Sequence, residues 1–240
     1  MSTQQHDDEQ RDEQQHDEQK QILLRYLQEG RDALLQKLDG LGEYDLRRPL
    51  VATGTNLLGL VKHVAGTESG YLGAVFGRPF PEPMPWMEEE AEPNADMWAT
   101  AEESSEQVVA QYRRVWAHSD ATVAALELDA PGFVPWWTNR DVTLHRILVH
   151  LTAETHRHAG HADLVRELID GRVGLRTTGD NLPPVPAEWW PEHVARLEAV
   201  ARGGGVELPA GLPGADSPVR VAPGLIALAG TLLPTSCRLA

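Results

Sequence analysis

Apolar residues recur with the period of an α-helix in four long segments of this chain, and this pattern constrains the fold more than any other feature of the sequence. The first segment covers residues 22–38 and ends before two glycines. The second covers residues 56–75 and ends before a run of Gly and Pro. Apolar residues spaced three or four positions apart share one face of a helix. Each segment therefore predicts an amphipathic helix with one buried stripe.

Two further helices are predicted in the second half of the chain. A capping box formed by Thr100 and Glu103 is expected to open the third, whose apolar period continues to residue 126. The fourth covers residues 143–169 and ends at Gly171. Four long amphipathic helices predict an all-α fold, a four-helix bundle.

The rest of the chain shows no sustained period. Residues 80–97 are rich in proline and acidic side chains, which predicts a long crossover connection between the second and third helices. Four parts are therefore expected: an acidic disordered tail over residues 1–20, the bundle over 21–172, an extension with a short extra helix over 173–203, and a flexible C-terminal tail over 204–240.

Charge and cysteine content exclude several classes of function. The net charge is -15, from 36 acidic and 21 basic residues, so neither nucleic acid nor an anionic membrane is an expected partner. Cys237 is the only cysteine, which excludes an intramolecular disulfide and a cysteine-based zinc finger and favours a reducing, cytoplasmic setting. Without an apolar leader or an unbroken apolar stretch of sufficient length, we expect neither secretion nor a membrane span.

Five of the ten histidines lie between His145 and His161, within the fourth predicted helix. The helical period places Glu154 and His158 on its apolar face. A carboxylate or imidazole on a buried stripe is costly unless it is paired or bound to a cation. Side chains at i and i+4 stand about 5–6 Å apart at Cβ, close enough to share one ion. The pair therefore predicts a divalent metal site.

His63 is the candidate for a third ligand, because it borders the apolar stripe of the second helix and bundles build metal sites from facing helices. Three protein ligands leave one position open, which is typical of catalytic rather than structural zinc. Zinc is the first choice, and nickel, iron or manganese also suit two imidazoles and a carboxylate. Such an ion would activate a bound water or thiol.

Other histidines of the fourth helix have predicted roles around this site. His161, one turn beyond His158, is the candidate catalytic base, with ligation or support of a ligand as alternatives. His150, one turn before Glu154, is a candidate to support the ligands. His156 points away from them and is expected to be solvated.

The loop before the fourth helix contains Trp136, Trp137 and Arg140. Aromatic side chains with a few polar groups are typical of ligand pockets, and an arginine can grip a carboxylate. We therefore take these three residues as candidate substrate contacts. The alternative is that they simply cap the core.

Two segments of the sequence resemble the DinB/YfiT-like metalloenzyme superfamily: Leu60-Val61-Lys62-His63, and His150 to Asp163, which reads HLTAETHRHAGHAD. The resemblance covers about residues 21–172 and is closest to the mycothiol-dependent branch. It implies a divalent-metal four-helix bundle. It also implies a low-molecular-weight thiol such as mycothiol, bacillithiol or glutathione as co-substrate.

Carried over position by position, the metal ligands of the superfamily fall on His63, Glu154 and His158. Many members have histidine where this chain has Glu154, so the site here resembles the glutamate variant. Glutamate in place of histidine still supplies a metal ligand, but it changes the charge of the site.

The function expected from these observations is a metal-dependent thiol S-transferase or isomerase acting on a small-molecule electrophile. One alternative is a non-catalytic bundle that binds a metal or small ligand. Another is an adaptor whose acidic N-terminus recruits a partner. A homodimer is compatible with the extra tryptophan-rich helix.

Overall fold

The computed structural model describes residues 3–175 and 182–203, with side chains from residue 17 onward. These two ranges belong to two separate units of the chain, and each is described by itself.

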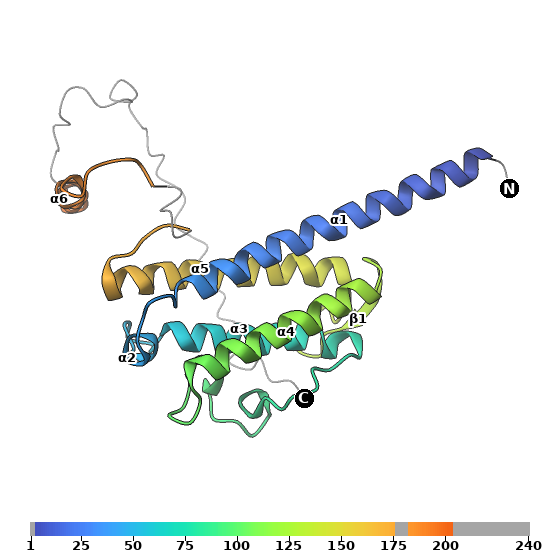
Figure 1. The fold of residues 1–240 in the computed structure, drawn as a ribbon, viewed down its shortest axis with the longest axis horizontal. Helices are drawn as coiled ribbons and strands as arrows, with labels where there is room; N and C mark the ends of the chain where they lie inside the picture. Colours follow the sequence, from blue (N-terminus) through green and yellow to red (C-terminus); the bar gives the residue numbers. More distant parts are fainter. Residues whose placement is uncertain (1–2, 176–181, 204–240) are drawn as a thin grey trace. The chain divides into compact units, whose positions relative to one another are not determined.

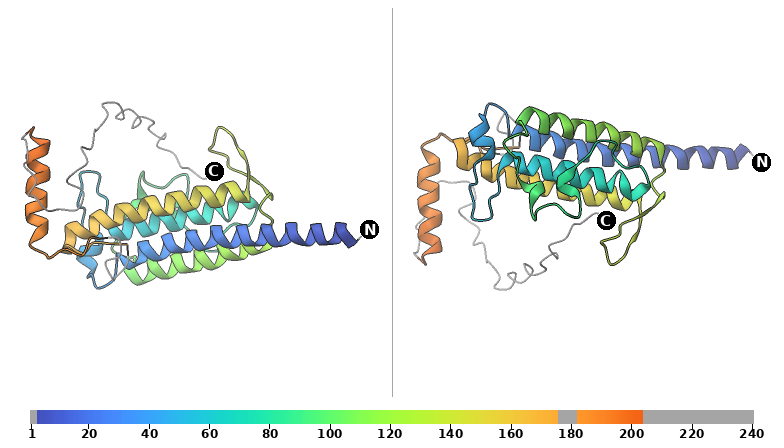
Figure 2. Two further views of the ribbon diagram at one scale, coloured as in Figure 1. Left: turned by 90° about the horizontal axis from the view of Figure 1, so that it is seen from above. Right: turned by 90° about the horizontal axis from the view of Figure 1, so that it is seen from below.

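Four long helices make up the first unit and lie side by side (Figures 1 and 2). They are α1 (Thr3–Gln36), α3 (Leu57–Tyr71), α4 (Ser105–Ala125) and α5 (Leu144–Asp170). Helix α1 packs on α5, α5 on α3, and α3 on α4. In Figure 1, α1 and α5 run in one direction while α3 and α4 run in the other. The predicted all-α fold is confirmed.

Short elements connect the long helices. They are α2 (Glu43–Arg47), the 3₁₀ helices η1 (Ala74–Phe76), η2 (Pro85–Met87) and η3 (Ala95–Met97), and the strands β1 (Pro131–Phe133) and β2 (Asp141–Thr143). The two strands pair antiparallel, with Gly132 opposite Val142. This hairpin forms within the segment predicted as a loop, and it leads directly into α5.

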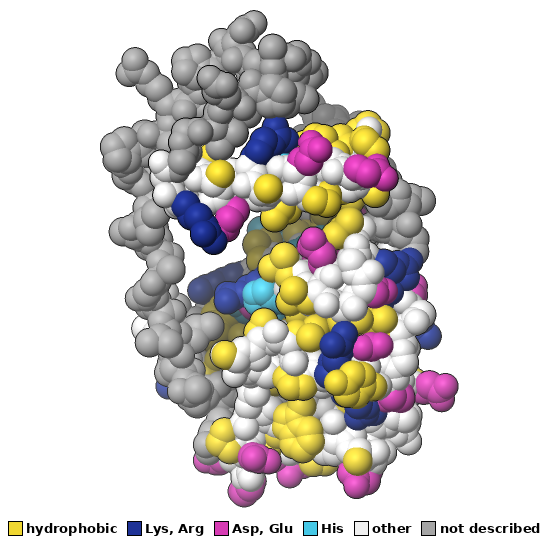
Figure 3. All heavy atoms as spheres, turned by 90° about the vertical axis from the view of Figure 1, so that its left-hand side faces the viewer, with side chains coloured by type: hydrophobic (Ala, Val, Ile, Leu, Met, Phe, Trp, Pro, Cys, Tyr) yellow, Lys and Arg dark blue, Asp and Glu magenta, His cyan; other side chains and the backbone are white. Residues whose placement is uncertain are grey.

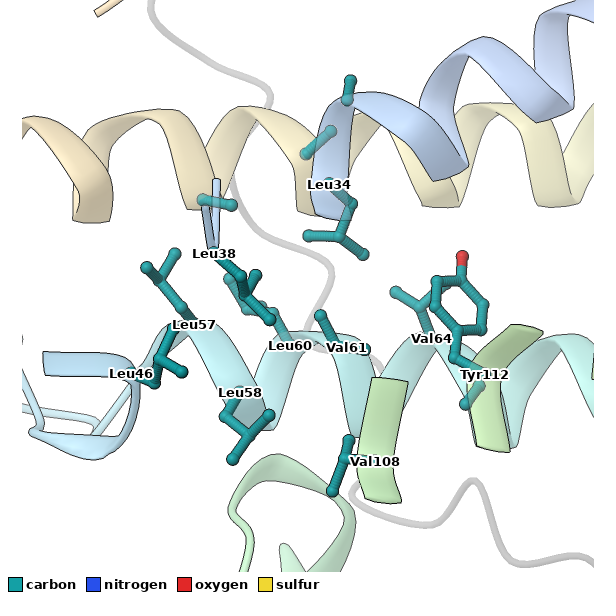
Figure 4. Packing of buried hydrophobic residues seen from close by; sticks show 14 of the residues in the cluster. Leu34, Leu38, Leu46, Leu57, Leu58, Leu60, Val61, Val64, Val108 and Tyr112 are labelled. Carbon is teal, nitrogen blue, oxygen red and sulfur yellow. The ribbon is translucent and has the colours of Figure 1, made fainter. Parts of the chain in front are cut away.

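The core consists of two clusters of buried apolar side chains. Figure 4 shows one of them, in which Leu34 of α1 and Leu38 just after it meet apolar residues of α3 and of the first half of α4, including Leu57, Leu60, Val61, Val64, Val108 and Tyr112. The other cluster gathers Leu27, Leu72, Val142, Ile147, Leu148 and Leu151 near the hairpin. Burial of such side chains is the main force that holds the helices together, at roughly 1.5–3 kcal/mol for each large one.

Residues 72–104 form the crossover between α3 and α4, and they run close against α3 at two glycines. A Cβ on Gly59 would stand 1.8 Å from the carbonyl oxygen of Met97. A Cβ on Gly66 would stand 2.5 Å from the Sδ atom of Met87. These glycines let the crossover approach the helix backbone more closely than any other residue would allow.

Helix α1 begins much earlier than the sequence analysis predicts. Residues 1–20 are expected to form a disordered tail, but the backbone is helical from Thr3. Between Thr3 and Gly30 the chain has no Gly or Pro and many Gln, Glu and Arg residues, which favour helix. High charge therefore does not exclude a helix at this end.

Helix α4 begins one turn later than predicted. Its N-cap is Ser104, and the capping box is formed with Gln107 rather than by Thr100 with Glu103. The carboxylate of Glu103 instead accepts hydrogen bonds from Lys62 Nζ, at 2.8 Å, and from the Thr100 amide, at 2.7 Å. Glu103 thus ties the crossover to α3.

The second unit contains helix α6 (Trp189–Ala201), which agrees with the extra helix predicted in the C-terminal extension. Its apolar side chains Trp190, Val194, Leu197 and Val200 are exposed. The predicted flexible tail over residues 204–240 lies outside the described residues.

On the face drawn in Figure 3, acidic and basic side chains are interspersed with hydrophobic ones. None of the helices in the described ranges combines the length and apolar character needed to cross a bilayer.

Candidate functional site

The two histidines predicted to meet across the bundle do lie together. The ring of His63 on α3 stands 4.7 Å from that of His158 on α5, between centroids, at an angle of 67°. The start of α3 is fixed by Asn56, whose side-chain oxygen accepts a hydrogen bond from the amide of Gly59 at 2.8 Å. This cap sets the first turns of the helix that carries His63.

Asp96 is a member of the site that the sequence analysis misses. Its Oδ2 atom lies 2.6 Å from Nδ1 of His63. Burial alone would raise the pKa of Asp96, but the hydrogen bond and charge of His63 together with Lys62 lower it below its ordinary value. Asp96 sits in the crossover, a segment without periodicity, so no local pattern marks it. Gly59 and Gly66 indicate only that some segment packs closely on α3, and they do not identify that segment.

His158 is held as a neutral imidazole. Its side chain is 13% exposed, and its Nδ1 atom is buried without a hydrogen-bond partner. Burial lowers the pKa of His158 to about 3, and the neighbouring His63 and His161 act in the same direction. At neutral pH the ring is therefore unprotonated and retains a lone pair that can bind a cation.

Glu154 lies beside His158 at the edge of the buried surface of α5. Its Oε2 atom is 3.8 Å from Nε2 of His158, and its side chain is 36% exposed. The sequence predicts Glu154 on the apolar face, and the centre of that face is occupied by Thr155 and Ala159. Helix α5 packs against both α1 and α3, so its buried face is wide. Glu154 and His158 therefore lie beside its centre.

His63, Glu154 and His158 carry donor atoms of the types that bind divalent metals. Within residues 17–175 and 182–203, no group of three His, Cys, Asp or Glu side chains is placed so that it could hold a metal ion. The donors are two imidazoles in contact and the carboxylate of Glu154, whose Oε2 atom lies on the Nε2 side of His158. Borderline metals such as zinc take nitrogen and oxygen donors of this kind.

The other histidines of α5 divide between the site and the neighbouring helix. His161 is exposed, and its ring centroid lies 5.4 Å from that of His158. The sequence predicts a solvated His156, and in the structure this side chain is half-buried against α1. Its Nε2 atom lies 2.9 Å from the carbonyl oxygen of Tyr26, and its ring packs where Gly30 leaves space on α1.

An aromatic cluster adjoins the site one helical turn along α5. The indole N–H groups of Trp136 and Trp137 both donate to the hydroxyl of Tyr71, at 3.2 and 3.1 Å. His150 contacts this cluster, with centroids 4.9 Å from Tyr71 and 4.8 Å from Trp137. Burial lowers the pKa of His150, which the charge of Glu154 partly opposes. The cluster thus connects the hairpin to the candidate metal ligands.

The candidate arginine of the substrate site packs on Phe133. The guanidinium of Arg140 lies over the ring of Phe133, 5.9 Å from its centroid. The guanidinium of Arg146 instead lies 4.9 Å from the ring centroid of Trp137. Arg146 projects from the first turn of α5, so the helix rather than the loop supplies the neighbouring cation.

Comparison with known proteins identifies the family of this chain. The family described as Mycothiol-S-transferase matches residues 22–171, which span most of α1 through the end of α5 and include every candidate ligand. A search of curated proteins gives no match. Since the match covers more than half of the chain, this protein belongs to the mycothiol S-transferase family.

Proposed function

We propose that this chain is a divalent-metal-dependent enzyme that uses a mycothiol-type thiol in S-transfer to a small electrophile, or in an isomerisation. The family supports the thiol. The contact between His63 and a neutral His158 is the observation that carries the metal-dependent part. A buried, unpaired imidazole nitrogen costs free energy unless a ligand satisfies it.

In this proposal His63, Glu154 and His158 hold the ion, with zinc as the first choice and nickel, iron or manganese as alternatives. The bound ion supplies positive charge that favours the thiolate form of the co-substrate. Three histidines would leave a divalent site with about two positive charges, and the one carboxylate here still leaves about one. This favours an anionic sulfur at the open position.

The chain's own residues move the proton and shape the pocket. His161 accepts the thiol proton, since it is exposed and lies next to a ligand. The sulfur then forms a bond to the electrophilic carbon, and the leaving group departs with the electron pair of the bond that breaks. Tyr71, Trp136 and Trp137 exclude water on one side, where Arg146 can bind a substrate carboxylate.

Turnover of monochlorobimane by the full chain tests the proposal. The assay compares mycothiol, bacillithiol and glutathione, with metal-loaded and chelated protein. We expect turnover with mycothiol that is lost on chelation and in His158→Ala, and retained in His145→Ala, an exposed histidine of the same helix. Turnover that does not depend on metal would overturn the proposal. Tight metal binding without turnover of any thiol would also do so, and would favour the non-catalytic alternative.

A further inference from the structure

The face of α3 that carries His63 also binds the crossover segment around η3. The side-chain amide of Asn56 donates to the carbonyl oxygen of Met97 at 3.2 Å. One turn on, Gly59 leaves room for the same carbonyl. The next turn brings Lys62, whose Nζ atom donates to the carbonyl oxygen of Trp98 at 3.0 Å. The N-cap of α3 and two positions in its first two turns therefore hold η3 in place.

Lys62 is itself fixed, which makes this attachment rigid. Its side chain is 3% exposed and forms an ion pair with Glu103 at 2.8 Å. Its ammonium group lies 4.3 Å from the ring centroid of Trp86. These contacts leave the buried ammonium group of Lys62 little freedom to move. The segment from η2 to Glu103 is thus anchored on both sides of Asp96.

We propose that η3 is a positioning element for the metal site, and that Asp96 is the residue through which it acts. In this arrangement Nδ1 of His63 carries the proton and donates a hydrogen bond to Oδ2 of Asp96, at 2.6 Å. The other ring nitrogen, Nε2, is then the unprotonated one that is offered to an ion. Metal-binding histidines are commonly held by a carboxylate in this way, which fixes the tautomer and strengthens the donor. The inference rests on the proposed function for the ligand role of His63.

Two substitutions of Asp96 separate charge from shape. Asp96→Ala removes the acceptor, whereas Asp96→Asn keeps an acceptor oxygen and removes the charge. Glu90→Gln is the matched control, because it removes one charge from an exposed position of the same crossover. Zinc affinity of the full chain is measured by competition with a chromophoric chelator. The tautomer of His63 is read from ¹⁵N NMR of the metal-free protein.

We expect Asp96→Ala to weaken zinc binding about 10–100-fold, Asp96→Asn less, and the control not at all. In the wild type His63 is the Nδ1–H tautomer, and this preference is lost in Asp96→Ala. Unchanged affinity and tautomer in Asp96→Ala would overturn the inference. If the wild type bound no zinc, the proposed function would fail, and the tautomer would still decide whether Asp96 positions His63.

Gly59→Ala provides a test that leaves both Asp96 and the ligands unaltered. The added Cβ forces the carbonyl of Met97 away, since the two would otherwise be 1.8 Å apart. We expect weaker zinc binding and a mixed His63 tautomer, with circular dichroism confirming that the helices persist. A folded Gly59→Ala protein with wild-type affinity and tautomer would show that η3 does not act on the site.

Discussion

The imidazole rings of His63 and His158 stand in edge contact at 4.7 Å, although they come from two helices that are separated in sequence by the crossover, α4 and the hairpin. They meet because α3 and α5 are neighbours that run in opposite directions (Figure 1). The site therefore depends on the packing of the bundle, and the features that determine this packing are open to test.

Removal of one partner of the ion pair between Arg31 and Glu68 should destabilise the bundle strongly. The guanidinium donates to both carboxylate oxygens, and the two side chains are 1% and 0% exposed. Glu68→Gln removes the buried counter-charge of Arg31 and leaves the half-exposed Asp120, at 2.9 Å, as its remaining ion-pair partner, which costs about 3 kcal/mol. Urea unfolding followed by circular dichroism measures this free energy.

A double substitution identifies the cause of that loss. We expect Arg31→Met combined with Glu68→Leu to be less destabilised than the sum of the single substitutions, since neither charge is then left alone. Glu29→Gln, an exposed carboxylate on α1, gives the baseline. Additive effects would show that the pair is not coupled.

Stability should fall in acid through Asp170 at the end of α5. Hydrogen bonds from Arg166, at 3.0 and 2.7 Å, lower the pKa of Asp170 below its ordinary value, and Arg172 contributes. A carboxyl whose pKa is lower in the folded than in the unfolded state stabilises the fold above its ordinary pKa of about 3.9. This contribution is lost as the pH falls through the folded pKa.

The measurement is the difference in unfolding free energy between the wild type and Asp170→Asn as a function of pH. It should be present at pH 6 and shrink below about pH 4. Asp129→Asn, at an exposed position, serves as the control. A difference that stayed constant down to pH 3 would contradict the role of the carboxylate charge.

Tyr71→Phe should loosen the hairpin and the aromatic cluster. The substitution removes the acceptor of two indole N–H groups, those of Trp136 and Trp137. Each half-buried donor left unsatisfied costs about 1 kcal/mol. Faster amide hydrogen exchange over residues 131–143 is expected, while Tyr44→Phe, at an exposed tyrosine, leaves it unchanged. Equal exchange in both variants would show that the hydroxyl does not hold the hairpin.

Much of the fold could be predicted because the signals are local. Helix α5 begins after its N-cap Thr143 and ends at Gly171, which adopts the left-handed conformation, close to the bounds predicted from the period and the glycine. The pairing of His63 with His158 also follows from helix faces. The apolar period predicts which side of each helix is buried, and the buried sides of neighbouring helices pack against each other.

The parts that could not be predicted depend on long-range contacts. Asp96 reaches His63 because the crossover packs on the glycines of α3, and nothing within its own segment encodes that approach. Glu154 lies at an edge because α5 has two neighbours, which a single periodic stripe does not reveal. A helical wheel shows which face of a helix is buried, whereas tertiary contacts determine which residues lie at the centre of that face.

Zinc content of the purified full chain tests the central claim most directly. Elemental analysis should give about one divalent ion per chain for the wild type and for His145→Ala, because three protein donors and an open position define a single site. The same measurement should give essentially none for His63→Ala and for His158→Ala. Unchanged metal content in both of these folded variants would contradict a site built between α3 and α5.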